Sequence, residues 1–245
     1  MNNISICLSP ALYPFYAEKD TTVIVVDIFR ATTSICAAFY NGARSVKTVA
    51  TIEEAKQMKL AGYLVAAERN VKRCDFADFG NSPFDFTPEK VKNQDLIFTT
   101  TNGTQAVEMA LEADEILIGA FSNIQSLCSY CLLVNKNILI ICSGWNNRVC
   151  IEDTLFAANL TEKLLKTKKF EYKSDAVRMA LEIWNLAKKD LKTYICTTEH
   201  YERLKNNELE NSVDYCLAEN TTPLIPKYDK ITKTFLITDK IYENK

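Results

Sequence analysis

The chain has 245 residues, of which 47% are hydrophobic and 24% are charged, and these are ordinary values for a globular protein with a large core. Its 29 lysines and arginines against 31 acidic residues leave a net charge of −2, so no basic excess indicates binding to nucleic acid, and no basic amphipathic face indicates binding to membranes. Any anionic ligand must therefore be held by a local site. The N-terminal stretch lacks the basic flank and long apolar run of a signal peptide or membrane span, so we expect a cytoplasmic protein.

The nine cysteines are scattered along the chain and odd in number, and several lie within apolar runs. This usage indicates free, mostly buried thiols in a reducing compartment. Cys128 and Cys131 form a C-x-x-C pattern, but the sequence holds no second pair at the spacing of a zinc site. Their apolar neighbours predict a buried helix, which favours a structural role for this pair.

Short apolar runs rich in branched residues predict buried strands at residues 23–27, 45–50, 64–68, 96–100, 115–119 and 138–142. Helical patterns follow most of these runs. Thr32 or Thr33 is placed to cap the first helix. Thr51 and Glu54 form a capping box for the second helix, which ends near Gly62.

Alternating strands and helices through residue 166 predict an α/β protein, a three-layer α/β/α fold with a largely parallel sheet. Residues 69–95 interrupt this rhythm and predict a long loop, which is more often functional than idle. From residue 174 onward the pattern is mostly helical. The tail, residues 223–238, predicts a strand pair at an edge of the sheet. Without repeats or linkers, residues 1–245 are expected to form a single compact domain, with two closely packed α/β halves as the alternative.

Polar residues stand at the carboxyl ends of several predicted strands: Asp27, Glu68, residues 99–104 and residues 142–144. In an open parallel sheet these ends share one edge, and ligands bind in the crevice beside that edge. We therefore expect one binding site to collect these residues.

Three carboxylates are candidate metal ligands: Asp27, Glu68 and Asp153. They suit Mg²⁺, which prefers carboxylate oxygens together with water and substrate phosphate. The chain's single histidine argues against a histidine-based zinc site. Asp153 has a competing explanation, because it and Glu152 lie in a predicted first helical turn where negative charge is stabilising.

The turn TTTNGT places hydroxyls, amides and a glycine where a strand passes into a helix, and such a turn favours an anion. Its candidate substrate contacts are Thr100, Thr101, Asn102, Gly103 and Thr104. The alternative is an ordinary capped helix with a tight turn.

Three arginines follow strand ends by a few residues: Arg30, Arg69 and Arg148. A guanidinium group can clamp phosphate, sulfonate or carboxylate with two hydrogen bonds, whereas surface ion pairs are the structural alternative. In the segment GNSP, Asn81 and Ser82 offer further substrate contacts, and the alternative is a turn that Pro83 holds.

Two phosphatase mechanisms can be compared with these residues. An aspartyl-phosphate mechanism usually needs a second aspartate two residues after the first, but Phe29 occupies that position after Asp27. A cysteine mechanism uses a C-x5-R loop, and Cys142 and Arg148 match its spacing, although Val149 stands where a hydroxyl residue is usual. The attacking group stays open between a metal-activated water, Asp27 and Cys142.

The sequence resembles the 2-phosphosulfolactate phosphatase family, the Mg²⁺-dependent phosphatases of coenzyme M biosynthesis. The resemblance rests on the stretches VVDIFRATTS, AAERN, DFGNSP, TTTNGT and ICSGWNNRVCIEDTLFAA, with weaker matches at TEHYERL and DYCLAENTTPLIPKY. These stretches run in a fixed order from about residue 23 to residue 228, and their combination is far more specific than any one of them.

The resemblance implies a three-layer α/β fold and hydrolysis of 2-phosphosulfolactate to sulfolactate and phosphate. It carries function onto Asp27, Arg30, Glu68, Arg69, Asn81, Thr101, Asn102, Gly103, Cys142, Glu152 and Asp153. Ala67, Asn147, Cys150 and Tyr201 depart from the commoner family residues around the site, which leaves the substrate more open than the reaction type. His200, early in a predicted helix, matches a family histidine and is a candidate acid or substrate contact, with a solvent-facing or capping role as the alternative.

We therefore expect a phosphoric monoester hydrolase with Asp27, Arg30 and Cys142 at its catalytic centre, Mg²⁺ as cofactor and a small anionic phosphorylated substrate. One alternative is the same chemistry on another small phosphorylated 2-hydroxy acid. A second alternative, from another functional class, is a phosphate-ligand sensor without turnover. The sequence leaves a homodimer open.

Overall fold

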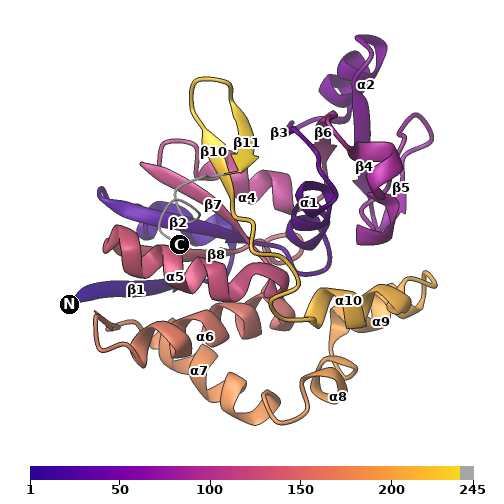
Figure 1. Ribbon diagram of the computed structural model, residues 1–245. Helices are drawn as coiled ribbons and strands as arrows, with labels where there is room; N and C mark the ends of the chain where they lie inside the picture. The colour runs from indigo at the N-terminus through magenta and orange to yellow at the C-terminus, as the bar shows by residue number, and fades with distance from the viewer. Residues whose placement is uncertain (238–245) are drawn as a thin grey trace.

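The computed structural model describes residues 1–237, and these residues form an α/β fold in which helices flank one large, mostly parallel mixed sheet (Figure 1). This architecture confirms the predicted fold class. The predicted tail segment extends to residue 238, which lies outside the described residues.

Two blocks of parallel strands make up most of the sheet. One block contains β7 (Glu115–Gly119), β2 (Thr21–Val26), β8 (Asn137–Cys142), β1 (Asn2–Cys7) and the short β9 (Phe170–Glu171). The other block contains β3 (Ser45–Thr48), β6 (Asp95–Thr99) and β4 (Leu64–Arg69), with β5 (Lys72–Arg73) antiparallel at its outer edge. All six predicted strands are present, at bounds close to those expected.

The C-terminal hairpin joins the two blocks. It consists of β10 (Pro226–Asp229) and β11 (Thr234–Ile237), and the strand order is β5-β4-β6-β3-β11-β10-β7-β2-β8-β1-β9. Lys227 pairs with Leu117 of β7, and the fully buried Phe235 pairs with Val46 of β3. The predicted edge position of this hairpin was therefore wrong. β7 and β3 would otherwise expose unpaired edges in the middle of the fold, and the hairpin satisfies both.

Chain direction changes across this hairpin. From β7 to β10, from β10 to β11 and from β11 to β3 every pairing is antiparallel, so the two parallel blocks run in opposite senses. In a flat sheet their carboxyl ends would lie at opposite edges. Sheets twist by about 20–25° per strand, however, and Figure 1 shows the strands of the two blocks pointing in clearly different directions.

The helices that follow the first strands are α1 (Ala31–Tyr40), α2 (Ile52–Leu60), α4 (Gly103–Met109), α5 (Ile124–Val134) and α6 (Ile151–Leu165). The predicted capping box opens α2: the Thr51 hydroxyl accepts a hydrogen bond from the Glu54 amide, and the Glu54 carboxylate accepts one from the Thr51 amide. The helix ends beside Gly62, whose φ of +92° suits a glycine.

The start of α1 differs from its prediction. The helix begins directly after Arg30, so Thr32 and Thr33 lie inside its first turn rather than at its cap. Their hydroxyls donate back to the carbonyl oxygens of Asp27 and Ile28, at 2.9 and 3.0 Å. These bonds hold the end of β2 against the start of the helix.

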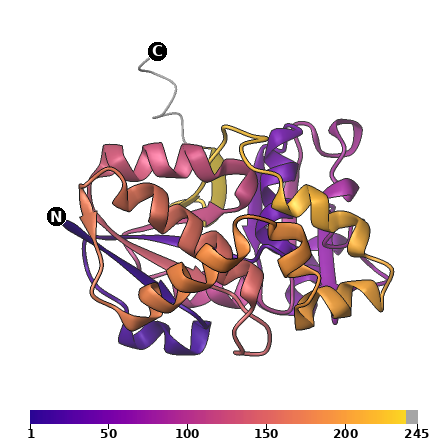
Figure 2. The same cartoon turned by 90° about the horizontal axis from the view of Figure 1, so that it is seen from below.

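The C-terminal part is helical, as predicted, with α7 (Asp175–Ala187), α8 (Leu191–Ile195), α9 (Glu199–Lys205), α10 (Val213–Leu217) and the 3₁₀ turn η4 (Glu210–Ser212). Figure 2 shows the salmon and orange helices α6 and α7 side by side across one face of the molecule, where they pack together. The segment predicted as one long loop contains β5, the 3₁₀ turn η2 (Pro83–Asp85) and the short helix α3 (Pro88–Val91).

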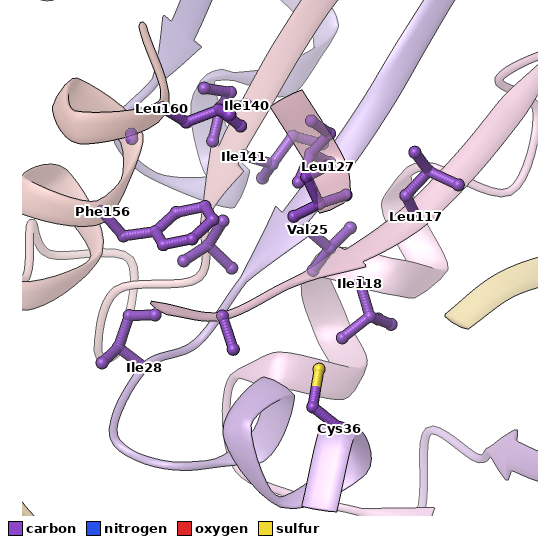
Figure 3. Close-up of a cluster of buried hydrophobic side chains, with 14 of the residues drawn as sticks. Val25, Ile28, Cys36, Leu117, Ile118, Leu127, Ile140, Ile141, Phe156 and Leu160 are labelled. Carbon is purple, nitrogen blue, oxygen red and sulfur yellow. The ribbon is translucent and has the colours of Figure 1, made fainter. Parts of the chain in front are cut away.

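The hydrophobic core lies between the sheet and the helices on its faces. All six residues of β2 are buried, so both faces of the sheet are covered there. Figure 3 shows Ile140 beside Leu160 of α6, and Val25 beside Ile141 and Leu127 of α5. Gly119 permits close packing, because a Cβ at that position would lie 2.8 Å from Cγ2 of Ile24 and 3.0 Å from the Phe156 ring.

All nine cysteines are free, and Cys128 and Cys131 are buried in α5, which confirms the structural interpretation of the C-x-x-C pair. Over residues 1–237, the structure contains no helix with the length and apolar character needed to cross a membrane. The 3₁₀ turns η1 (Pro10–Phe15) and η3 (Phe121–Asn123) complete the set of elements.

Candidate active site

The carboxyl ends of the two parallel blocks converge at one place. Asp27 follows β2 in the first block, and Gly103 follows β6 in the second. A Cβ at Gly103 would lie 2.9 Å from Oδ2 of Asp27 and 2.7 Å from Cβ of Ala31, so only glycine permits this approach. The predicted convergence is therefore present, although it joins two blocks of opposite direction rather than one edge of a uniform parallel sheet.

The Asp27 carboxyl group is buried beneath the start of α1. Its Oδ1 accepts a hydrogen bond from the Ala31 amide at 3.2 Å, and its own amide donates to the Thr32 hydroxyl at 2.9 Å. The pKa of Asp27 is raised to about 6, mainly by burial; His200 and the Ala31 amide lower it, and the carboxylates of Glu68 and Glu152 raise it. Asp27 is thus a carboxylate that is held rigidly and is costly to ionise without a cation.

Glu68 reaches the same turn from β4. Its Oε1 accepts hydrogen bonds from the Val71 amide and, at 3.3 Å, from the Thr101 hydroxyl. Its neighbour Arg69 donates to the Thr99 hydroxyl at 2.8 Å and to the Glu68 carbonyl at 2.7 Å. Arg69 therefore ties the ends of β4 and β6 together, and two of the three predicted metal ligands, Asp27 and Glu68, lie against the TTTNGT turn.

Unpaired polar atoms gather around this convergence. Arg30 is only 3% exposed, yet neither its Nε nor its Nη1 has a hydrogen-bond partner among the described residues. The same is true of buried Oδ1 of Asn81 and of the Thr100 and Ser143 hydroxyl oxygens. Asp27, Glu68 and Asp85 all act electrostatically on Arg30, while burial lowers the pKa of its guanidinium group. Because buried polar groups are normally paired, this set has the character of a binding site for an anion.

Asp153, predicted as a metal ligand, accepts hydrogen bonds from two backbone amides. Its Oδ1 accepts a hydrogen bond from the Ile28 amide at 2.8 Å, and its Oδ2 accepts one from the Gly144 amide at 3.0 Å. Burial together with the charges of Glu152 and Asp27 raises its pKa well above the usual range. Asp153 therefore clamps the loops after β2 and β8, and each oxygen has only one lone pair left for another contact.

Cys142 lies at the end of β8 and is fully buried. Burial raises the pKa of its thiol far above the usual range, and the charges of Asp153 and Glu152 act in the same direction. A nucleophilic cysteine needs a stabilised thiolate, which cations or a helix N-terminus usually provide. The surroundings of Cys142 are those of a core thiol.

We expect Cys142→Ala to retain phosphatase activity within about threefold of the parent value, because the thiol stays protonated and its removal leaves only a small cavity. Steady-state phosphate release at saturating substrate measures this directly. A loss of 1,000-fold with an unchanged melting temperature would contradict the structural assignment. Cys128→Ala, in α5, is the matched control for removal of a buried thiol far from the strand ends.

Arg148 and Ser82 are the other predicted substrate contacts. The Arg148 side chain is 58% exposed, forms an ion pair with Glu199 at 3.5 Å and lies 4.6 Å from the Trp145 ring. It does not form a phosphate loop with the buried Cys142, so the C-x5-R spacing is a chance match. Ser82 is half-buried at the start of η2, and its carbonyl oxygen accepts the Asp85 amide.

The TTTNGT turn also contacts the loop after β8. Oδ1 of Asn102 accepts a hydrogen bond from the Asn146 amide at 3.0 Å. The Thr104 hydroxyl donates to the Thr100 carbonyl at 2.9 Å, inside α4, which makes Thr104 a support of the turn. The two loops thus lie against one another at the mouth of the site.

One buried group of polar side chains was not predicted as a group. Nδ1 of His200 in α9 is hydrogen-bonded to Oε1 of Glu152 and lies 3.8 Å from Sγ of Cys150, and all three residues are buried. The Phe29 ring contacts the His200 ring edge to face, with centroids 5.6 Å apart. The sequence resemblance marked Glu152 and His200 separately, but no pattern along the chain pairs residues so far apart.

A cavity of about 140 Å³ adjoins this group. Its lining comes from the loop after β8, the start of α6 and α9: Trp145, Arg148, Val149, Cys150, Ile151, Glu152, Thr198, Glu199, His200 and Arg203. The Arg203 guanidinium lies 3.9 Å from the Trp145 ring. The cavity therefore has two arginines at its sides and the Glu152–His200 pair in its wall.

Comparison with known proteins identifies the family of the chain. The 2-phosphosulpholactate phosphatase family matches residues 7–230. A probable 2-phosphosulfolactate phosphatase of Clostridium novyi is 35% identical over 220 residues, which cover 88% of this chain and 93% of the relative. A protein of the same description in Caldanaerobacter subterraneus is 32% identical, over 85% of this chain and 88% of the relative. Another, in Thermotoga maritima, is 33% identical, over 84% of this chain and 88% of the relative. The chain therefore belongs to the 2-phosphosulfolactate phosphatase family.

Proposed function

We propose that this protein is a phosphoric monoester hydrolase that converts 2-phosphosulfolactate to sulfolactate and phosphate. Family membership supports the enzyme class, and the names of its relatives support the substrate. In the family resemblance this reaction belongs to coenzyme M biosynthesis. The substrate is small and strongly anionic, which suits a protein whose own net charge is close to zero and whose cations must act locally.

The single observation that carries the proposal is the buried, unpaired guanidinium of Arg30. Two of its N–H donors lack partners within the described residues, beside the strand ends where Asp27 and the TTTNGT turn meet. A phosphoryl group satisfies such donors through two of its oxygens. Since charge on those oxygens changes as the phosphate ester breaks, fixed donors at this position stabilise the transition state.

A divalent cation of the Mg²⁺ type fits the acidic side of the site. The carboxylate oxygens of Asp27 and Glu68 lie against Gly103 and Thr101 of the TTTNGT turn and are suitable ligands for such an ion. The raised pKa of Asp27 reflects its burial beside other carboxylates. Asp27 and Glu68 would hold the ion, while Asp153 would keep the end of β2 in place through the Ile28 amide. When bound, Mg²⁺ would neutralise negative charge on the phosphoryl oxygens.

The chain's own residues then have distinct tasks. Arg30 binds and orients the phosphoryl group, and the Thr100 and Ser143 hydroxyls offer it further donors. Asp27 is less suited to attack phosphorus, because the Ala31 amide holds its Oδ1 and the backbone of Gly103 lies against Oδ2. Water is therefore the proposed nucleophile, and the buried walls of the site limit its access to productive positions.

The reaction takes place in the cytoplasm in this proposal. Nine free cysteines, most of them buried, are typical of a protein kept in a reducing compartment.

A panel of phosphorylated 2-hydroxy acids tests the function. We expect 2-phosphosulfolactate to release phosphate only when Mg²⁺ is present, and a chelator to stop the reaction. For an analogue with hydrogen in place of the sulfonate, we expect kcat/KM to be at least about tenfold lower. Faster turnover of a phosphorylated carboxylic acid without a sulfonate would identify that acid, rather than 2-phosphosulfolactate, as the substrate. Tight binding of the panel without phosphate release under any metal condition would instead indicate a ligand sensor.

A further inference from the structure

A second group of metal-binding atoms lies beside the proposed phosphate site. Cys150 precedes α6, Glu152 is in its first turn, and His200 lies in α9, 48 residues further along the chain from Glu152. One sulfur, one carboxylate oxygen and one ring nitrogen from these residues all lie within 4.8 Å of one another. The cavity of about 140 Å³ adjoins all three.

An unpaired carboxylate oxygen points independently to a ligand here. Glu152 is 1% exposed, and its Oε2 has no hydrogen-bond partner within the described residues, while Oε1 contacts His200. A buried carboxylate oxygen without a donor is costly unless a cation or water satisfies it. Asp27 and Asp153 add negative charge to the surroundings, since both act electrostatically on the Cys150 thiol. Arg203 is the cation that opposes them.

We propose that Cys150, Glu152 and His200 bind a divalent transition-metal ion of the zinc class, with a fourth position open to the cavity. Three protein ligands and one water are the usual arrangement of an open tetrahedral site. Bond lengths of about 2.3 Å to sulfur and about 2.0 Å to nitrogen place these atoms about 3.5 Å apart in a tetrahedron. The observed separation of Sγ and Nδ1, 3.8 Å, is close to that value.

The ligand types separate this site from the proposed Mg²⁺ site. Thiolate and imidazole suit zinc-class ions, whereas Mg²⁺ prefers oxygen ligands alone. Binding of the ion breaks the hydrogen bond between His200 and Glu152, so the two side chains move apart to bind it, and the protons displaced from this hydrogen bond and from the Cys150 thiol pass to solvent. The presence of a single histidine argued against a zinc site made of several histidines. Here Cys150 and Glu152 supply the ligands that additional histidines provide in such sites. The proposal does not depend on phosphatase activity.

Titration of the metal-free protein with Co²⁺ tests the site, because a Co²⁺–thiolate bond absorbs in the near ultraviolet and tetrahedral Co²⁺ absorbs strongly in the visible. We expect both absorptions to saturate at one ion per chain. A stoichiometric amount of Zn²⁺ should abolish them, and a large excess of Mg²⁺ should leave them unchanged. Absence of the thiolate absorption in the parent protein would overturn the proposal.

Variants assign the ligands. Cys150→Ser should remove the thiolate absorption, and Glu152→Gln should weaken Co²⁺ binding about 10- to 100-fold. Cys74→Ser is the matched control, because Cys74 is a free, partly exposed thiol outside the cavity lining, and this variant should keep the full signal. A Cys150→Ser protein with the parent spectrum would refute the assignment. If that variant does not fold, His200→Gln carries the test, and undiminished Co²⁺ affinity in it has the same meaning.

Discussion

Arg30→Met is expected to lower kcat/KM for phosphate release by about 10²–10³-fold, the loss that follows removal of one fixed donor to transition-state charge. The same substitution should leave the free energy of unfolding unchanged or slightly higher. Arg30 is buried with two unpaired N–H donors, so the folded protein carries a desolvated charge that an apolar side chain of similar length does not have. Lost activity without lost stability distinguishes a binding residue from a structural one.

Ligand protection provides a readout of Arg30 that does not depend on turnover. Inorganic phosphate should raise the melting temperature of the parent protein through binding to the folded state, and Arg30→Met should remove most of that shift. Arg30→Lys keeps the charge but not the planar fork, and an intermediate loss is expected. Arg44→Met is the control, because Arg44 pairs with Asp95 and its side chain is 64% exposed. Phosphate protection that survives in Arg30→Met would exclude Arg30 from the site.

Asp27→Asn is expected to abolish activity, by about 100-fold or more, and to stabilise the metal-free protein at pH 8. The folded-state pKa of Asp27 is raised from 3.8 to about 6, so the folded chain holds this proton more tightly than the unfolded chain does. The parent protein therefore gains stability from Asp27 as pH falls from about 6 to about 4, and loses that contribution as pH rises through 6. At pH 8 the buried charge costs about 1–3 kcal/mol, which asparagine removes.

Urea unfolding at pH 5 and pH 8 in the presence of a chelator measures this effect. The advantage of Asp27→Asn should be about half as large at pH 5 as at pH 8, because pH 5 lies between the pKa values of Asp27 in the unfolded and the folded chain. Asp95→Asn is a control of opposite sign, because Arg44 and Ser45 hold the pKa of Asp95 below its usual value, so this change should destabilise the protein at pH 8. If Asp27→Asn is instead less stable than the parent at pH 8, interactions within the folded protein already offset the cost of burying the Asp27 charge.

Local chemistry accounts for the elements that were predicted correctly. Each buried strand was recognisable because its run of branched residues is short and apolar along its whole length, as in β2. The start of α2 was predictable because its capping box lies within four residues, Thr51 to Glu54. In both cases the interactions that decide the structure lie within a few residues of one another.

The position of the C-terminal hairpin was not predictable from local sequence, because long-range contacts decided it. Nothing within β10 and β11 shows that they lie between two blocks of sheet, because that position depends on the open edges of β7 and β3. Cys142 and Arg148 have the spacing of a phosphate loop, and only the structure shows that Cys142 is buried and that the Arg148 side chain is exposed.

From its sequence alone, this protein is an α/β protein with polar groups at the strand ends, and its motifs resemble the phosphatase family to which the chain belongs. These properties follow from the order of residues within short segments. Only the tertiary structure decided which groups meet: the approach of Gly103 to Asp27, the clamp made by Asp153, and the pairing of Glu152 with His200. Each joins segments that are distant along the chain, so its geometry depends on how the two parallel blocks and the C-terminal helices pack.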